Sequence, residues 1–173
     1  VRYQAVIAYD GANYQGFQRQ ATGVPSVQAA IEEALSTVIG QPIRVLGAAR
    51  TDTGVHAVGQ VIAFDANEDQ WRHGERALLR AMNTELPDDV AVQRLERAPD
   101  GFHPRFDAHS RTYCYCVYEA EQRQPLYART SWHVYGRLNV VAMNEVAATL
   151  LGEHDFATFG APTQGESTIR QVI

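Results

Sequence analysis

The sequence predicts an α+β fold in which an antiparallel sheet carries helices on one face. Short apolar runs rich in β-branched and aromatic residues alternate with segments whose apolar residues recur at helical spacing. Clusters of turn residues separate these elements. The composition, 45% hydrophobic and 20% charged among 173 residues, is that of a globular protein rather than a disordered one.

Residues 1–100 predict strands and helices in the order β-α-β-β-α-β. An apolar run at 3–9 is typical of a strand. Ser26 is a candidate N-cap for a helix that ends at Gly40. A second helix is expected at 71–83, and further strands are expected at 42–46, 60–64 and 90–95. This order is the ferredoxin-like split arrangement.

A second unit is expected at residues 101–173. A strand is predicted at 112–118, a helix at 139–151 and a last strand at 168–173. This second β-α-β lacks the α-β that would complete it, so we expect only the first part of another similar domain.

Charge and targeting signals narrow the functional classes only in part. The formal net charge is −5, yet all fifteen basic residues are Arg, which pairs well with phosphate and stacks on bases. Neither a signal peptide nor an apolar stretch of about 20 residues is apparent, so we expect a cytoplasmic protein without a membrane anchor. Cys114 and Cys116 have no zinc-type companions, which predicts no metal site.

The segment Arg50-Thr51-Asp52-Thr53-Gly54-Val55-His56 is the first candidate for chemistry. It places a carboxylate two residues after a guanidinium and beside a glycine, between two predicted strands. A nearby Arg favours an ionised carboxylate and can also hold a phosphate. Asp52 is therefore a candidate nucleophile, although a turn residue that bonds its own backbone has the same pattern.

Two further segments combine aromatic and polar residues. Phe102-His103-Pro104-Arg105-Phe106 precedes the strand predicted at 112–118, a mixture found where bases stack and phosphates are held. A connector that plugs the core with Phe side chains is the alternative interpretation. The loop after the first strand, residues 9–20, carries amides and aromatics that could line a cleft or simply pack.

These segments together resemble the TruA family of tRNA pseudouridine synthases. Residues 50–56 resemble the family's Arg-Thr-Asp-Ala-Gly-Val-His, with Thr53 in place of Ala and Ala49 in place of a preceding Gly. Further matches follow in the family's order at 9–20, 26–28, 83–89, 102–106, 111–115 and 152–156. The resemblance covers essentially the whole chain.

The resemblance implies a cofactor-free and metal-free isomerase that converts uridine to pseudouridine at positions 38–40 of the tRNA anticodon stem-loop. Asp52 would attack either C6 of uracil or C1′ of ribose, Arg50 would pair with the carboxylate or a phosphate, and Tyr113 would pack on the target base. Family members are homodimers. The residues expected to contact RNA or substrate are Gln18, Arg19, Thr51, Gly54, His56, His103, Arg105 and Arg111.

Family chains continue well beyond Ile173, so we expect this chain to lack the end of its second domain. Two other functions fit parts of the sequence. One is a non-catalytic RNA-binding module on the same type of sheet, which would leave the Asp52 segment unexplained. The other is a metal-dependent hydrolase using Asp52, His56 and His103, which would need more convergent ligands.

Overall fold

Strand β1 (Arg2–Tyr9) lies inside a four-stranded antiparallel sheet whose order is β2-β3-β1-β4. Its side chains alternate, and Tyr3, Ala5, Ile7 and Tyr9 are the buried ones. This period of two is what a strand with one face on the core requires. The other strands of the sheet are β2 (Val45–Gly47), β3 (Ala57–Asp65) and β4 (Val90–Arg97).

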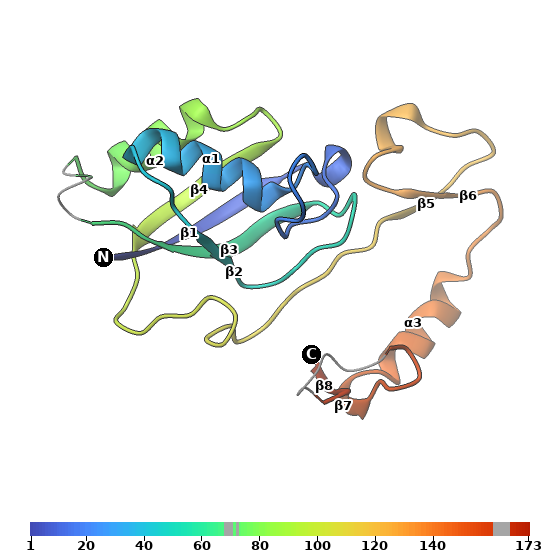
Figure 1. Ribbon diagram of the computed structural model, residues 1–173. Coiled ribbons are helices and arrows are strands. Elements are labelled where there is room, and N and C mark those ends of the chain that lie inside the picture. The colour runs from blue at the N-terminus through green and yellow to red at the C-terminus, as the bar shows by residue number, and fades with distance from the viewer. Residues whose placement is uncertain (68–70, 72, 161–166) are drawn as a thin grey trace. The chain divides into compact units, whose positions relative to one another are not determined.

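The computed structural model describes residues 1–67, 71, 73–160 and 167–173 (Figure 1). The chain divides into two compact units, Val1–Cys114 and Tyr115–Ile173. The sheet and both of the longer helices belong to the first unit, together with the short 3-10 helix η1 (Gly11–Asn13).

Helices α1 (Val27–Ile39) and α2 (Glu75–Glu85) lie over the same side of the sheet (Figure 1). As predicted, Ser26 caps α1, because its Oγ accepts the Ala29 N–H at 3.3 Å, and Gly40 ends the helix with a φ of 81°. A side-chain cap of this kind contributes about 1 kcal/mol. The side chains buried most fully between helices and sheet are Ile7, Ile31, Leu35, Ile62, Phe64, Leu78 and Met82.

Side chains of the helices bond backbone groups of both outer strands. The Val45 N–H donates to Glu32 Oε1 at 3.0 Å and the Val45 carbonyl accepts from Gln28 Nε2 at 2.9 Å. On the other side, Asn83 Oδ1 accepts the Val92 N–H at 2.8 Å and its Nδ2 donates to the Val92 carbonyl at 2.9 Å. At Val45 and Val92, helix side chains thus supply the hydrogen-bond partners that a neighbouring strand would otherwise supply.

The predicted element order is confirmed for this unit, although several boundaries differ; β3, for example, begins at Ala57 rather than at residue 60. Strand β2 begins at Val45 rather than at 42, because Pro42 has no N–H and the Ile43 N–H donates to Ser36 Oγ of α1 at 3.1 Å. Helix α2 begins after Gly74, whose φ is 78°, and Trp71 lies outside it with its indole N–H on the Gly74 carbonyl at 2.9 Å. Residue 72 of the predicted helix lies outside the described residues.

The second unit contains two small sheets and one helix. Strand β5 (Val117–Glu119) pairs in parallel with β6 (Trp132–Val134), and the 3-10 helix η2 (Pro125–Tyr127) lies between them in sequence. Helix α3 (Val140–Ala148) precedes the antiparallel pair β7 (Gly152–Asp155) and β8 (Ile169–Val172).

The strand predicted at 112–118 is wrong in extent, since only residues 117–119 are regular strand. Residues 112–116 are exposed and have no partner residues in a described sheet, although the Cys116 carbonyl accepts the Trp132 N–H of β6 at 2.8 Å, so they lack the continued ladder that a strand needs. The apolar residues of α3 are likewise exposed, because the described part of this unit offers no sheet face that buries them. The single β-α-β sheet expected here is therefore replaced by two separate strand pairs.

Candidate active site

Asp52 lies on a tight turn between β2 and β3. The Val55 N–H donates to the Asp52 carbonyl at 3.2 Å, and Gly54 has a φ of 78°, a left-handed conformation that favours glycine. The side chains of Arg50 and Asp52 are both exposed, and no ion pair joins them among the described residues. The turn thus presents a solvent-accessible carboxylate on a defined backbone.

The loop after β1 holds the Asp52 turn on both sides. The Phe17 N–H donates to the Thr51 carbonyl at 2.9 Å, and the Gly54 N–H donates to the Tyr14 carbonyl at 3.3 Å. These bonds bracket Asp52. A Cβ on Gly16 would lie 2.8 Å from the Thr51 carbonyl oxygen, so the close approach requires glycine there.

Gly11 makes an even closer approach to the end of the turn. A Cβ at Gly11 would lie 2.0 Å from the Val55 carbonyl oxygen, which leaves no room for a side chain. The Gly11 N–H donates to His56 Nδ1 at 3.1 Å, and Asp10 Oδ1 lies 3.0 Å from the same nitrogen. A neutral Nδ1 accepts from Gly11, whereas a protonated Nδ1 would donate to Asp10. In either state His56 ties the turn to the loop after β1.

Tyr9 bonds the residue that precedes Asp52. The Tyr9 hydroxyl and Thr51 Oγ1 are 2.8 Å apart and share a hydrogen bond. Burial raises the pKa of Tyr9, the bond with Thr51 lowers it, and the nearby Tyr113 phenol raises it further. Tyr113 itself is 75% exposed. Tyr113 therefore has a ring that is open to solvent and an electrostatic influence on Tyr9.

Arg111 connects the segment around Phe102–Phe106 to the strand end before Arg50. Its Nη2 donates to the carbonyls of Ala48 and Arg105, both at 3.1 Å. His103 Nδ1 accepts the Arg105 N–H at 3.2 Å, and the His103 ring lies 4.3 Å from that of Phe106, centroid to centroid. Arg111 and His103 therefore organise this segment through their own side chains.

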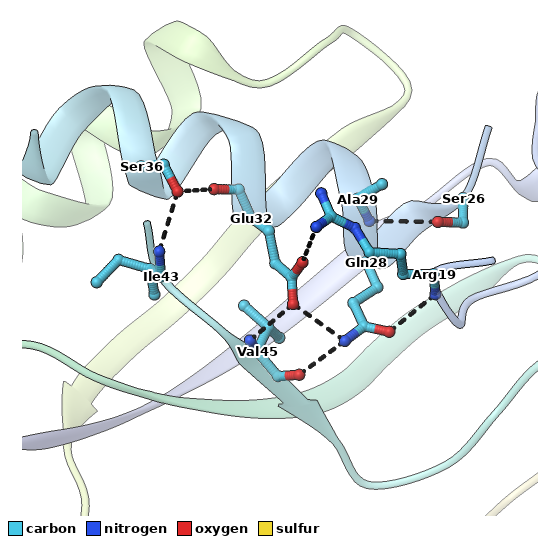
Figure 2. A network of polar contacts seen from close by, with 8 residues as sticks. All are labelled: Arg19, Ser26, Gln28, Ala29, Glu32, Ser36, Ile43 and Val45. Atoms are coloured by element: carbon cyan, nitrogen blue, oxygen red, sulfur yellow. Dashed lines mark hydrogen bonds and ion pairs between the residues drawn. The ribbon is translucent and has the colours of Figure 1, made fainter. Parts of the chain in front are cut away.

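Arg19 takes part in a polar network that anchors its loop to α1 (Figure 2). Its Nη1 lies 3.2 Å from Glu32 Oε2, an ion pair that lacks the alignment of a hydrogen bond. Gln28 Oε1 accepts the Arg19 N–H at 2.9 Å, while its Nε2 donates to Glu32 Oε1 at 3.1 Å. The Glu32 side chain is buried, whereas 45% of the Arg19 side chain is exposed. Gln18 is exposed beside it.

A shallow cavity of about 560 Å³ lies at the opposite end of β1 and does not include Asp52. Arg2 and Asp65 line it and form a two-point ion pair with distances of 2.9 and 2.7 Å. The hydrogen bond from Arg2 lowers the pKa of Asp65. Because these side chains satisfy one another, the exposed Asp52 turn is the better candidate for chemistry.

Comparison with known families decides what kind of protein contains this turn. The family model described as tRNA pseudouridine synthase matches residues 5–107, which include most of the sheet, the Asp52 turn and the segment up to Asp107. The chain belongs to the tRNA pseudouridine synthase family. The family match therefore covers the segment that carries the candidate nucleophile.

Several curated members of the tRNA pseudouridine synthase family align along nearly the whole chain. "tRNA pseudouridine synthase A" of Geobacter sulfurreducens is 43% identical over 168 residues, which cover 96% of this chain and 67% of that relative. The protein of the same name from Geotalea uraniireducens is 40% identical, covering 97% and 68%. That of Neisseria gonorrhoeae is 38% identical, covering 99% and 64%. The chain thus spans about two-thirds of the length of these relatives.

The described residues of this synthase-family chain form neither a metal-binding cluster nor a membrane-spanning helix. In the described ranges, no group of three or more His, Cys, Asp or Glu side chains could hold a metal ion. His103 therefore does not join Asp52 and His56 in a metal-binding cluster. None of the described helices is long and apolar enough to cross a membrane.

In this synthase-family chain, the surroundings of the Asp52 turn also include Gly11, Tyr14 and Asp89, for which the sequence alone predicts no individual role. Gly11 bonds His56 across 45 positions, and Tyr14 bonds Asp89 across 75 positions. No local spacing connects such partners. All four residues lie in segments that resemble the family, so the sequence does point to these segments. It does not show which residue of one segment bonds which residue of another.

We expect Glu32→Ala to lower the free energy of unfolding of this family member by about 2–4 kcal/mol, because the Val45 N–H and Gln28 lose a buried partner. Urea unfolding of the wild type and the variant measures the loss. Glu33→Ala is the matched control, since Glu33 is the exposed neighbour on the same helix, and its effect should stay within about 0.5 kcal/mol. Equal losses for both variants would show that the network in Figure 2 does not stabilise the fold.

Proposed function

We propose that this chain supplies the Asp52-bearing part of a tRNA pseudouridine synthase, which isomerises uridine to pseudouridine in the anticodon stem-loop at positions 38–40. The observation that carries the proposal is the exposed Asp52 carboxylate on a turn whose backbone is bonded on both sides. A covalent nucleophile must be reachable and held in place, and this turn meets both requirements. The family match to residues 5–107 supports the choice of reaction.

The reaction conserves all atoms of the substrate. The Asp52 carboxylate adds to C1′ of the ribose or to C6 of the uracil, and the bond between C1′ and N1 breaks. The uracil rotates within the site, and C5 then forms the new bond to C1′. The proton on C5 leaves to a base, N1 takes up a proton, and the carboxylate is released unchanged.

The target base must leave its stack before Asp52 can reach it, and the side chains around the turn favour that step. The exposed ring of Tyr113 offers a face on which an extruded base can stack. Arg50 and Gln18 offer exposed donors for phosphate or base. Arg19, Arg105, Arg111, His56 and His103 already make contacts within the protein, so they would contact RNA through their remaining donors. Thr51 and Gly54 would act through the backbone of the turn.

We further infer a ferredoxin-like first domain, a cytoplasmic location and a homodimeric assembly. The strand order β2-β3-β1-β4, with two helices over one side of the sheet, supports the first of these. The location follows from the proposed tRNA substrate. The homodimer rests on the family resemblance alone.

Tritium release from tRNA labelled at C5 of uridine tests the proposal, because the reaction must expel that hydrogen. We would assay this chain and a chimera in which it replaces the matching part of the Geobacter sulfurreducens relative. Release by either protein, with pseudouridine found at the labelled position, supports the proposal. If both bind tRNA and neither releases tritium, the chain is an RNA-binding module instead.

A further inference from the structure

Tyr14 and Asp89 form a short hydrogen bond between the loop after β1 and the start of β4. The Tyr14 hydroxyl donates to Asp89 Oδ1 at 2.5 Å, and Tyr14 is only 8% exposed. Asn13 Nδ2 donates to the other carboxylate oxygen at 3.2 Å, and the Asp10 N–H donates to the Asp89 carbonyl at 2.9 Å. Asp89 thus holds this loop at three points.

The same tyrosine bonds the Asp52 turn through its backbone. Its carbonyl accepts the Gly54 N–H at 3.3 Å, and Gly54 is two residues after Asp52. A continuous path of bonds therefore runs from Asp89 through the side chain and backbone of Tyr14 to the turn. Because the Tyr14 ring is buried and tethered at its tip, the position of its carbonyl is restricted.

We propose that Tyr14 and Asp89 are positioning residues that hold the Asp52 turn at the geometry needed for nucleophilic attack. The catalytic part of this inference rests on the proposed function. A nucleophile must be held within about 0.5 Å of its productive position, and such accuracy comes from tethered supporting residues. The exposed Asp52 side chain has no such support of its own among the described residues.

The phenol acts through position rather than through proton transfer. Burial and the bond to Asp89 raise the pKa of Tyr14 well above its ordinary value, so the hydroxyl remains a donor to Asp89 at neutral pH. Its proton is already committed to Asp89, which leaves none for a substrate.

Amide hydrogen exchange at Gly54, followed by NMR in this chain, tests the tether without any tRNA. We expect Tyr14→Phe to speed exchange at Gly54 by at least about tenfold, while the Ile62 amide in β3 exchanges as before. Tyr3→Phe is the matched control, because Tyr3 is a second buried tyrosine whose hydroxyl has no hydrogen-bond partner among the described residues. Asp89→Ala should match Tyr14→Phe, and Asp89→Asn should restore much of the protection, since Asn keeps an acceptor oxygen.

Tritium release under single-turnover conditions tests the catalytic consequence. We expect Tyr14→Phe and Asp89→Ala to lower the rate by about 10–100-fold while the Kd for tRNA stays within about threefold. Unchanged exchange at Gly54, or faster exchange with an unchanged rate, overturns the inference. If the wild type and the chimera release no tritium at all, the proposed function fails, whereas the exchange measurement still decides whether the tether exists.

Discussion

Asp52→Asn is expected to abolish tritium release from C5-labelled tRNA in the chain or chimera that shows activity, with a loss of at least about 10⁴-fold. The amide keeps the shape of the side chain and removes the negative charge that makes it a nucleophile. Since Asp52 has no side-chain partner among the described residues, the free energy of unfolding should change by less than about 0.5 kcal/mol. The Kd for tRNA should also remain within about threefold.

Asp100→Asn provides the control for this experiment. Asp100 is an exposed acid in the turn after β4, among the residues lining the shallow cavity at the far end of the sheet. Asp100→Asn removes one negative charge, as Asp52→Asn does. Any effect of that lost charge on tRNA binding alone would therefore appear in both variants. A residual rate for Asp52→Asn within tenfold of the wild type would exclude Asp52 as the nucleophile.

Gly11→Ala is expected to have the second-largest effect, because its Cβ would lie 2.0 Å from the Val55 carbonyl oxygen. Backbone must move to relieve such an overlap, and the nearest backbone belongs to the Asp52 turn. We expect a loss of about 1–3 kcal/mol in the free energy of unfolding and at least about 100-fold in the rate of pseudouridine formation. Urea unfolding and the tritium assay measure the two losses.

Gly59→Ala separates this clash from a general intolerance of larger residues. Gly59 lies in β3 of the same sheet, and its new Cβ would meet only Val6 Cγ1 at 3.9 Å, an ordinary contact. The variant should therefore keep both stability and rate. Similar losses in the two variants would mean that the contact between Gly11 and Val55 has no special importance.

Local signals in the sequence predict much of the first unit. Ser26 and Gly40 mark the ends of α1 because capping depends on residues within one turn of the helix. The start of β2 is predicted less well, since a side chain of α1, Ser36, bonds the Ile43 backbone there. Residues 112–116 have the composition of a strand, but a strand exists only where another one pairs with it.

In the candidate site too, local sequence predicts some features, whereas others depend on tertiary contacts. The exposed carboxylate beside a turn glycine is visible in residues 50–56, and the structure places Asp52 and Gly54 accordingly. The bonds that hold the turn join backbone groups of Tyr14 and Phe17 to it, and backbone groups are identical in every sequence. Only the tertiary fold can therefore pair them.

The side chains of Gln28, Glu32 and Asn83 have a consequence for how copies of this chain can meet. An outer strand with free N–H and C=O groups is a template on which another strand can add, in aggregation or in peptide binding. At Val45 and Val92 those groups already bond the helices, one on each margin of the sheet. A strand of a second copy therefore cannot pair at Val45 or Val92 unless these helix side chains first release the backbone.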